Sequence, residues 1–359
     1  MAISKNLKFL YNSIFDGVET WVANRISDII EIKNLYKYKP NSRPSKEYKK
    51  AVKQFWGKYS NISPKWGWYY ASRNKNYDPR YIPNTLIYTK IDQYFNNKKA
   101  GYGFNDKNYY DLIFKSVKQP DTLVRNINGI FVDRQYHLIP KDDIINIIKA
   151  EEHLICKPSM ESGSGRGICF WNTRNDINAI VEYINDKTEK NYIIQKLIKQ
   201  HPDLEEVHRG SINTIRIVSL LNQDGTHILS SNLRMGVGES KIDNVTAGGI
   251  SCGINIDGTL KKYATSYYAG EHFAQHPQGF IFEGKTIPSF HKIVDIIKDI
   301  HQQIPHFRLV SWDFAVDIEG EPILIEANMR KGGINLNQFN NGPLFGDLTE
   351  TVLDEVYSK

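Results

Sequence analysis

The sequence predicts an α+β protein with much antiparallel sheet, and three observations lead to this prediction. From Asp106 onward, short apolar runs typical of strands alternate with amphipathic stretches typical of helices, without a strict strand–helix–strand repeat. Two apolar runs flank Glu319-Gly320, a pair suited to a hairpin turn. Residues 1–105 have patterns that are mainly typical of helices, and they are rich in Trp and Tyr. We therefore expect a helical N-terminal region, 1–105, and two α+β parts, 106–195 and 196–359.

The individual elements follow from local signals. Ser4 to Leu35 is helix-like, and Ser45 is a suitable N-cap for a helix running toward Tyr59. The aromatic residues after it could stack on sugar rings, but they more often fill a small core. Further helices are expected at Lys141–Ala150, Asn175–Asn185, Phe290–Gln303 and Asp347–Val356. Strands are expected at Leu123–Val132, His153–Lys157, Gly167–Trp171, Tyr192–Leu197, Asn213–Leu221, His227–Met235, Gly249–Ile256, Leu309–Ile318 and Pro322–Ala327.

Composition narrows the class of protein. The 359 residues are enough for two or three domains, and 40% hydrophobic with 24% charged residues is typical of a soluble globular chain. The net charge of +6 suits anionic ligands such as nucleotides, but it is not concentrated in a tail that would indicate nucleic-acid binding. The oligomeric state stays open.

Cysteine usage and hydropathy favour a cytoplasmic protein. Cys156, Cys169 and Cys252 have no CxxC spacing and are odd in number, so we expect neither a disulfide framework nor a zinc site. No apolar run is long enough to span a membrane, and no signal-peptide core is present. The lysine-rich start could lie on a membrane, although packing on the protein itself is the stronger expectation.

The segment 311–333 contains the strongest functional signal. If the hairpin turn consists of Glu319-Gly320, Asp313 lies directly opposite Glu326, and Asn328 points to the same face. Three hard oxygen ligands on one face suit Mg²⁺ that carries substrate phosphates. A solvated acidic face is the alternative, but both carboxylates lie within apolar stretches. A one-residue change of register would undo the arrangement.

A second candidate site lies upstream, where an apolar strand leads to Lys157 and the glycine-rich segment 162–167. Glycines let backbone amides approach phosphate oxygens, and the lysine supplies positive charge. The segment is not a P-loop, because no Gly-Lys-Ser/Thr closes it and a strand follows. It is not a protein-kinase loop either, because there the lysine follows the glycines. Taken alone, it could be a plain loop.

Together, and in this order, these parts resemble the ATP-grasp superfamily over residues 106–335. The resemblance implies the ATP-grasp fold, in which two α+β lobes clamp ATP, with two Mg²⁺ ions for which Mn²⁺ can substitute. Asp313, Glu326 and Asn328 match the family's metal ligands, and Asp203 or Glu206 could hold the ribose. The remaining ATP-binding residues that it implies are Lys107, Lys157, Ser162, Gly163, Ser164, Gly165, Gly167, Gln195, Lys196 and Leu197.

The likeness extends to the sugar-transfer-associated branch of ATP-grasp proteins. It rests on the segments 106–110, 211–218, 233–237 and 243–249 and on the aromatic N-terminal region. Members of that branch are thought to join amino-acid or sugar units by amide bonds. The resemblance therefore implies an ADP-forming carboxylate–amine ligase in polysaccharide biosynthesis, with small-molecule, possibly sugar-linked, carboxylate and amine substrates.

Catalytic roles follow from this hypothesis. Arg234 would neutralise charge on the transferred phosphoryl group, Arg216 would share that role or bind the carboxylate, and Arg330 lies beside flexible Gly332-Gly333 at the substrate edge. Each strand arginine could instead form a plain ion pair, and 330–333 could be a capped turn. A kinase acting on a hydroxyl would share the same ATP site, and a catalytically silent nucleotide-binding module is the third reading.

Overall fold

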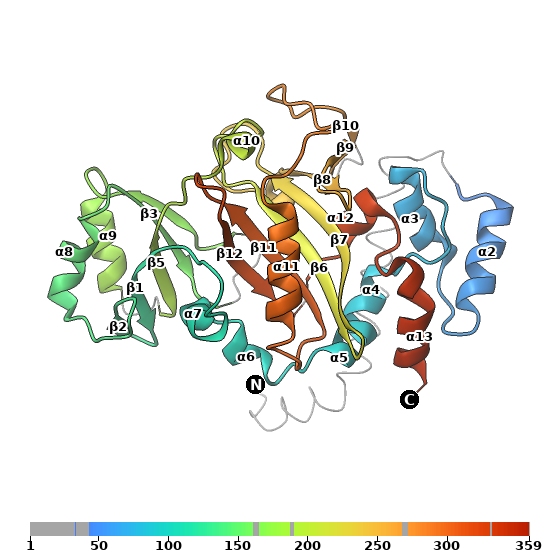
Figure 1. Ribbon diagram of the computed structural model, residues 1–359, viewed down its shortest axis with the longest axis horizontal. Coiled ribbons are helices and arrows are strands. Elements are labelled where there is room, and N and C mark those ends of the chain that lie inside the picture. Colours follow the sequence, from blue (N-terminus) through green and yellow to red (C-terminus); the bar gives the residue numbers. More distant parts are fainter. Residues whose placement is uncertain are drawn as a thin grey trace, which may run out of the picture.

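The computed structural model describes residues 33, 43–160, 165–186, 190–267, 272–330 and 332–358 (Figure 1). The expected helix Ser4 to Leu35 lies outside the described residues, apart from Lys33. The described part contains two sheets, and every strand pair in both is antiparallel. The predicted α+β class with much antiparallel sheet is therefore confirmed.

The smaller sheet has five strands in the order β2-β1-β5-β3-β4, with α8 and α9 beside it (Figure 1). Its core contains apolar residues of both helices, which pack against Leu154 and Ile194. Its strands are β1 Thr122–Ile127, β2 Ile130–Val132, β3 His153–Pro158, β4 Cys169–Asn172 and β5 Tyr192–Lys196. Its helices are η3 Lys141–Asp143, α8 Ile144–Ile148 and α9 Ile177–Asn185.

One strand prediction in this sheet is wrong. The stretch Leu123–Val132 is a hairpin of β1 and β2. Its turn consists of Asn128 and Gly129, with φ of 52° and 90°. Asn and Gly tolerate the left-handed region better than other residues, and Asn-Gly is the strongest sequence signal for such a turn. The turn dipeptide should therefore have outweighed the β propensity on either side of it.

The larger sheet has seven strands in the order β10-β9-β8-β7-β6-β11-β12. Helix α11, Phe290–His301, lies across it in Figure 1 and buries Ile293, Ile297 and Ile300 in a core with apolar residues of the sheet. The strands are β6 Thr214–Asn222, β7 Gly225–Met235, β8 Ile250–Ile254, β9 Leu260–Ser266, β10 His272–Phe273, β11 Leu309–Val316 and β12 Pro322–Asn328.

The helices outside the sheets enclose an aromatic core. Ser45 caps α2 by accepting a hydrogen bond from the backbone N–H of Tyr48 at 3.1 Å, as expected. Trp56, Trp66 and Trp68 are each 1% exposed, so the aromatic residues fill a core, which they share with residues of β6 and the C-terminal helices. These helices are α2 Lys46–Trp56, α3 Pro64–Asn74, α4 Asn84–Leu86, η1 Ile87–Ile91, α5 Asp92–Phe95, α12 Asn335–Asn341, η5 Gly346–Leu348 and α13 Thr349–Tyr357.

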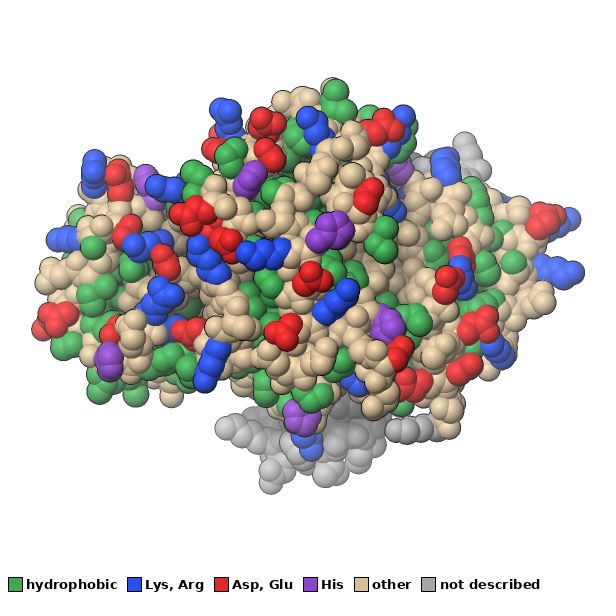
Figure 2. All heavy atoms as spheres, in the orientation of Figure 1, with side chains coloured by type: hydrophobic (Ala, Val, Ile, Leu, Met, Phe, Trp, Pro, Cys, Tyr) green, Lys and Arg blue, Asp and Glu red, His purple; other side chains and the backbone are tan. Residues whose placement is uncertain are grey.

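Short helices connect these layers. They are α6 Gly101–Phe104, η2 Lys107–Tyr109, α7 Tyr110–Ile113, α10 Pro202–Glu205 and η4 Val245–Ala247. No helix in the described ranges is both long and apolar enough to cross a membrane. On the face seen in Figure 2, acidic and basic side chains are interspersed.

The C-terminal hairpin has the predicted pairing at one end only. Asp313 pairs with Glu326, but Phe314 pairs with Leu324, so the register shifts between them. The turn is one residue longer than expected, because the N–H of Asp317 bonds the carbonyl of Glu321 at 3.0 Å. A bulge at Ile325 compensates for the longer turn and restores the predicted pairing beyond it.

Candidate functional site

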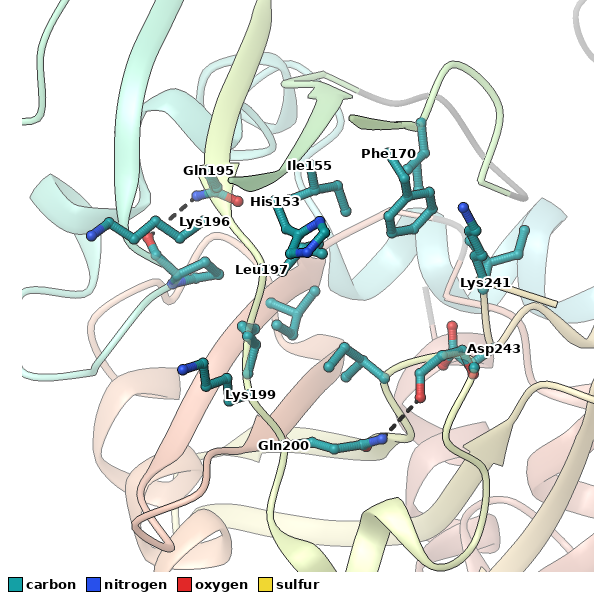
Figure 3. A pocket seen from close by; sticks show the side chains of 18 of the residues that line it. His153, Ile155, Phe170, Gln195, Lys196, Leu197, Lys199, Gln200, Lys241 and Asp243 are labelled. Carbon is teal, nitrogen blue, oxygen red and sulfur yellow. Dashed lines mark hydrogen bonds between the residues drawn. The ribbon is translucent and has the colours of Figure 1, made fainter. Parts of the chain in front are cut away.

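A cavity of about 750 Å³ lies where the two sheets face each other (Figure 3). On the smaller sheet, Phe170, Ile155 and Gln195 form a row across β4, β3 and β5, because each is the direct partner of the next. The opposite wall includes Ile318 and the bulge residue Ile325 of the C-terminal hairpin. The cavity is thus flanked by apolar side chains from both sheets, which suits a flat, largely apolar ring system.

Gln195 contributes a polar group to this cavity. Its Nε2 donates to the hydroxyl of Thr122 at 3.0 Å and to the carbonyl of Pro120 at 3.4 Å. Its Oε1 is buried without a hydrogen-bond partner, and in Figure 3 it is turned toward Ile155. A buried acceptor without a partner is costly, so a donor on a bound ligand would find this position favourable.

The neighbouring positions on and after β5 differ in role. Leu197 lines the cavity and is 38% exposed. Lys196 also lines it, but its ammonium group pairs with Glu151, which raises the pKa of Lys196. Asp203 lies outside the cavity lining, with its side chain 66% exposed, whereas Glu205 of the same helix lines the cavity. Glu206, the other candidate from sequence, does not line the cavity either, so the ribose-binding residue stays a prediction.

The glycine-rich segment is described only in part. Ser162, Gly163 and Ser164 lie outside the described residues. Gly165 and Gly167 have φ of 73° and 76°, a region that other residues rarely adopt. The backbone at both positions therefore adopts a conformation that favours glycine over other residues.

Two lysines distant in sequence meet beside the cavity. The N–H of Lys107 donates to the carbonyl of Ser159 at 2.8 Å, which fastens η2 to the end of β3. The Nζ of Lys107 lies 2.6 Å from Oε1 of Glu326 on β12. Burial lowers the pKa of Lys157 to about 8, and the like charge of Lys107 contributes to this shift as the second-largest cause. The negative charge of Glu326 offsets part of it. The three groups therefore form one electrostatic cluster.

The second half of the cluster surrounds Asp313, which is 4% exposed. Arg216 on β6 donates from Nε to Oδ1 of Asp313 at 2.7 Å and from Nη2 to Oδ2. Arg234 on β7 lies 3.4 Å from the same carboxylate, and the amide of Asn328 also lies 3.4 Å from it. Burial alone would raise the pKa of Asp313, but the charges of Arg216 and Arg234 bring it below its ordinary value.

Two residues of the segments that carried the resemblance, Tyr110 and Asp243, support the cluster, a structural role that the sequence did not assign to them. The hydroxyl of Tyr110 bonds both the N–H and the carbonyl of Ala327, each at 3.2 Å, and so fixes the backbone between Glu326 and Asn328. Asp243 accepts from Thr214 and lies 3.5 Å from Arg234. Asp243 and Thr214 both line the cavity, so they connect it to the arginines. Burial raises the pKa of Tyr110, which stays a neutral hydrogen-bonding group.

Arg330 lies near the end of the hairpin. A Cβ added at Gly101 of α6 would come within 2.6 Å of the Cδ of Arg330, so this glycine leaves room for the arginine side chain. Lys331 lies outside the described residues. The expected roles of Arg330, Gly332 and Gly333 stay predictions.

The donor set fits a hard divalent cation. In the described ranges, no three Asp, Glu, His or Cys side chains come together as a metal-binding group. A site here would consist of Asp313 and Glu326, directly opposite each other, with the Asn328 amide oxygen. Two carboxylates and an amide suit Mg²⁺, which usually keeps several waters and binds substrate phosphates. Both carboxylates are already neutralised by protein cations.

Comparisons with known proteins give a family. The model of the family described as "Sugar-transfer associated ATP-grasp" matches residues 88–352. No curated protein matches.

Solved structures similar to the chain include three ligases. ATP-grasp ligase PsnB with minimal precursor, Mg and ADP is 11% identical over 73% of this chain and 62% of that one, with a TM-score of 0.43. VanG D-Ala:D-Ser ligase from Enterococcus faecalis is 12% identical over 71% and 61%, with a TM-score of 0.43. The L-amino acid ligase from Bacillus licheniformis is 14% identical over 70% and 47%, with a TM-score of 0.38. The chain thus spans less than two thirds of each of these proteins.

Proposed function

Because the chain belongs to the sugar-transfer associated ATP-grasp family, we propose that it is an ATP-dependent ligase that joins a carboxylate to an amine. One observation supports the proposal above the others. Four cations (Lys107, Lys157, Arg216 and Arg234) and the carboxylates of Asp313 and Glu326 meet at the edge of a cavity between two sheets. Such a cluster can hold a triphosphate and neutralise charge during phosphoryl transfer.

The cavity would take the nucleotide. The adenine ring would lie between the apolar row of the smaller sheet and Ile325, against backbone groups of 195–197. Lys107 and Lys157 would bind phosphate oxygens, with the amides of the glycine-rich segment, 162–167, covering them. The ribose would lie near α10, for which Asp203 is the candidate from sequence and Glu205 lines the cavity. The regions 106–195 and 196–359 would then be the two lobes that clamp ATP.

Asp313, Glu326 and Asn328 would hold Mg²⁺, which when bound neutralises phosphate charge and orients the phosphates. The arginines have a separate task. Arg216 and Arg234 would keep some of their hydrogen bonds to Asp313 and donate others to the transferred phosphoryl group or to the substrate carboxylate. Asp313 keeps both guanidinium groups in place, so their orientation is set before the substrate arrives.

The chemistry follows from the poor reactivity of carboxylates. A substrate carboxylate oxygen attacks the γ-phosphorus of ATP, the bond to the β-phosphate oxygen breaks, and ADP leaves with that electron pair. The amine then attacks the acylphosphate carbon and expels phosphate, while the ammonium proton passes to phosphate or water. Phosphorylation replaces an oxide leaving group by phosphate and so divides one difficult step into two easier ones. Arg330 beside Gly332 and Gly333 would bind the anionic intermediate.

The family description favours a substrate linked to sugar transfer. We propose that the product is an amide between an amino acid, or a related unit, and a glycan precursor in polysaccharide or cell-surface biosynthesis.

Hydroxylamine trapping tests the proposal. The protein is incubated with ATP, Mg²⁺ and pools of amino acids, uronic acids and sugar acids, and hydroxylamine captures any acylphosphate as a hydroxamate. We expect hydroxamate and ADP in equal amounts. Asp313→Asn should abolish both, whereas Asp317→Asn, at the turn end of the same hairpin, should retain them because Asp317 pairs with Lys118 outside the cluster. A phosphorylated alcohol without hydroxamate would refute the ligase and indicate a kinase.

A further inference from the structure

Two cysteines that the sequence separates by twelve residues are direct partners in the smaller sheet. Cys156 on β3 pairs with Cys169 on β4. Directly opposite residues in an antiparallel pair have Cα atoms about 4.5–5.5 Å apart, and disulfides form at Cα separations of roughly 4.4–6.8 Å. Both cysteines belong to the core between the sheet and its helices, so their side chains project from the same face. The register therefore meets the backbone requirement for a cross-strand disulfide.

The two thiols differ in access. Cys156 is fully buried in β3, which lies between β5 and β4, whereas Cys169 is partly exposed because β4 is at the edge of the sheet. A solute can therefore reach the second cysteine, and the first is its direct neighbour. All three cysteines of the described part are thiols.

We propose that Cys156 and Cys169 form a reversible oxidation site, in which a hydroperoxide converts the two thiols to a disulfide that brackets the glycine-rich segment. The Cys169 thiolate attacks the peroxide, the O–O bond breaks, and a sulfenic acid and water or an alcohol form. The Cys156 thiolate then attacks the Cys169 sulfur, the S–O bond breaks, and hydroxide leaves as water. Two thiols lose two electrons and two protons, and the peroxide accepts them.

Cys252 provides the contrast within the same chain. It is fully buried, and its thiol donates to the carbonyl of Lys261 at 3.3 Å. Its direct partners on the neighbouring strands are Leu233 and Ala264, so no second thiol lies opposite it. It lies on β8 of the other sheet, away from Cys156 and Cys169 in the fold. We therefore expect it to stay reduced.

The disulfide would join the two strand ends from which the glycine-rich segment extends. Lys157 directly follows Cys156, and residues 157–168 make up the chain between the two cysteines. Oxidation would close this stretch into a covalent loop and limit how far the strand ends separate. The disulfide itself does not depend on the proposed ligase activity, so either proposal can fail without the other.

A thiol titration tests the proposal first. The folded protein is exposed to a small excess of hydrogen peroxide, quenched in acid and unfolded, and its thiols are counted. We expect the count to fall from the three of the sequence to one, with the mass loss of two hydrogens, and dithiothreitol should restore it. Cys156→Ala and Cys169→Ala should each prevent the disulfide, whereas Cys252→Ala should still form it.

Proteolysis then locates the bond. Arg166 lies between the two cysteines and is exposed, so an arginine-specific protease can cut the chain there. We expect the two fragments that meet at Arg166 to stay joined on a non-reducing gel of the oxidised protein and to separate after reduction. Fragments that separate without reductant, a thiol count that stays at three, or a bond that includes Cys252 would each refute the site. Because these readouts come from the wild-type chain, they do not depend on how well the variants fold.

Discussion

Replacing Lys157 by Met should stabilise the protein while weakening its binding of ATP. Lys157 is 8% exposed, and burial together with Lys107 lowers its pKa to about 8. A drop of that size corresponds to about 3 kcal/mol of unfavourable free energy for the charged lysine. Lys157→Met has a similar shape without the charge, so its free energy of unfolding at pH 7 should be about 2–3 kcal/mol higher than that of the wild type.

The pH dependence of this difference gives the sharper test. When the pKa of a lysine is lower in the folded state than in the unfolded state, protonation favours the unfolded state. The lysine then lowers the free energy of unfolding at every pH at which the unfolded chain binds more protons. The cost is therefore complete below pH 8 and fades as pH rises from about 8 toward about 10.4, the ordinary lysine value. Urea unfolding of both proteins between pH 7 and pH 10 should show the difference shrinking steadily.

The matched control is Lys196→Met on the neighbouring strand. Lys196 pairs with Glu151 and its pKa is raised, so its removal should cost up to about 1 kcal/mol rather than stabilise. Mg²⁺ and ATP should raise the Tm of Lys196→Met as they raise that of the wild type, because the proposed contact of residue 196 with adenine is through its backbone. They should not raise the Tm of Lys157→Met. A Lys157→Met protein less stable than the wild type at pH 7, or one that binds ATP equally well, would refute this reasoning.

Three other predictions follow. Asp313→Asn should lower the free energy of unfolding, measured with urea, by about 3 kcal/mol because two buried arginines lose their counter-charge. Glu326→Gln should lower it by under about 1 kcal/mol because the side chain of Glu326 is 33% exposed. Both variants should abolish ADP release. Ser219→Ala should cost about 1–3 kcal/mol by the same measurement, because the hydroxyl joins Trp312 Nε1 to His301 Nδ1. Burial lowers the pKa of His301 to about 4, so unfolding at graded pH should show up to about 3 kcal/mol of stability lost between pH 6.5 and 4, less in His301→Gln.

The C-terminal hairpin shows that a correct strand pairing can be predicted from an incorrect turn. Apolar alternation predicted both strands, and the expected two-residue turn gave the pairing of Asp313 with Glu326. The actual turn is longer, and the bulge at Ile325 cancels the error before the carboxylates. Nothing local in the sequence marks this bulge, because Ile325 looks like any strand residue. Its position also turns Ile325 into the cavity, a role that the sequence did not reveal.

Contacts between distant elements were hardest to predict. The order of motifs predicted a phosphate-binding role for Lys107, but only the fold shows that its backbone N–H bonds to Ser159 and its side chain pairs with Glu326. Asp243 accepts a hydrogen bond from Thr214, a contact between two segments that the sequence does not reveal. The cysteines illustrate the same limit: their spacing matched no motif, and strand register alone makes Cys156 and Cys169 partners.

The charges of the cluster imply that nucleotide and divalent cation should bind together. Lys107 and Arg216 are each bound to a carboxylate, so a triphosphate that attracts them leaves Glu326 and Asp313 less neutralised. A divalent cation would replace the lost positive charge. ADP affinity measured by calorimetry should therefore rise at least tenfold, or about 1.4 kcal/mol, on addition of Mg²⁺. Glu326→Gln should reduce the increase in ADP affinity caused by Mg²⁺, because the variant removes one of the two negative charges that the cation would neutralise. An unchanged increase would refute the coupling.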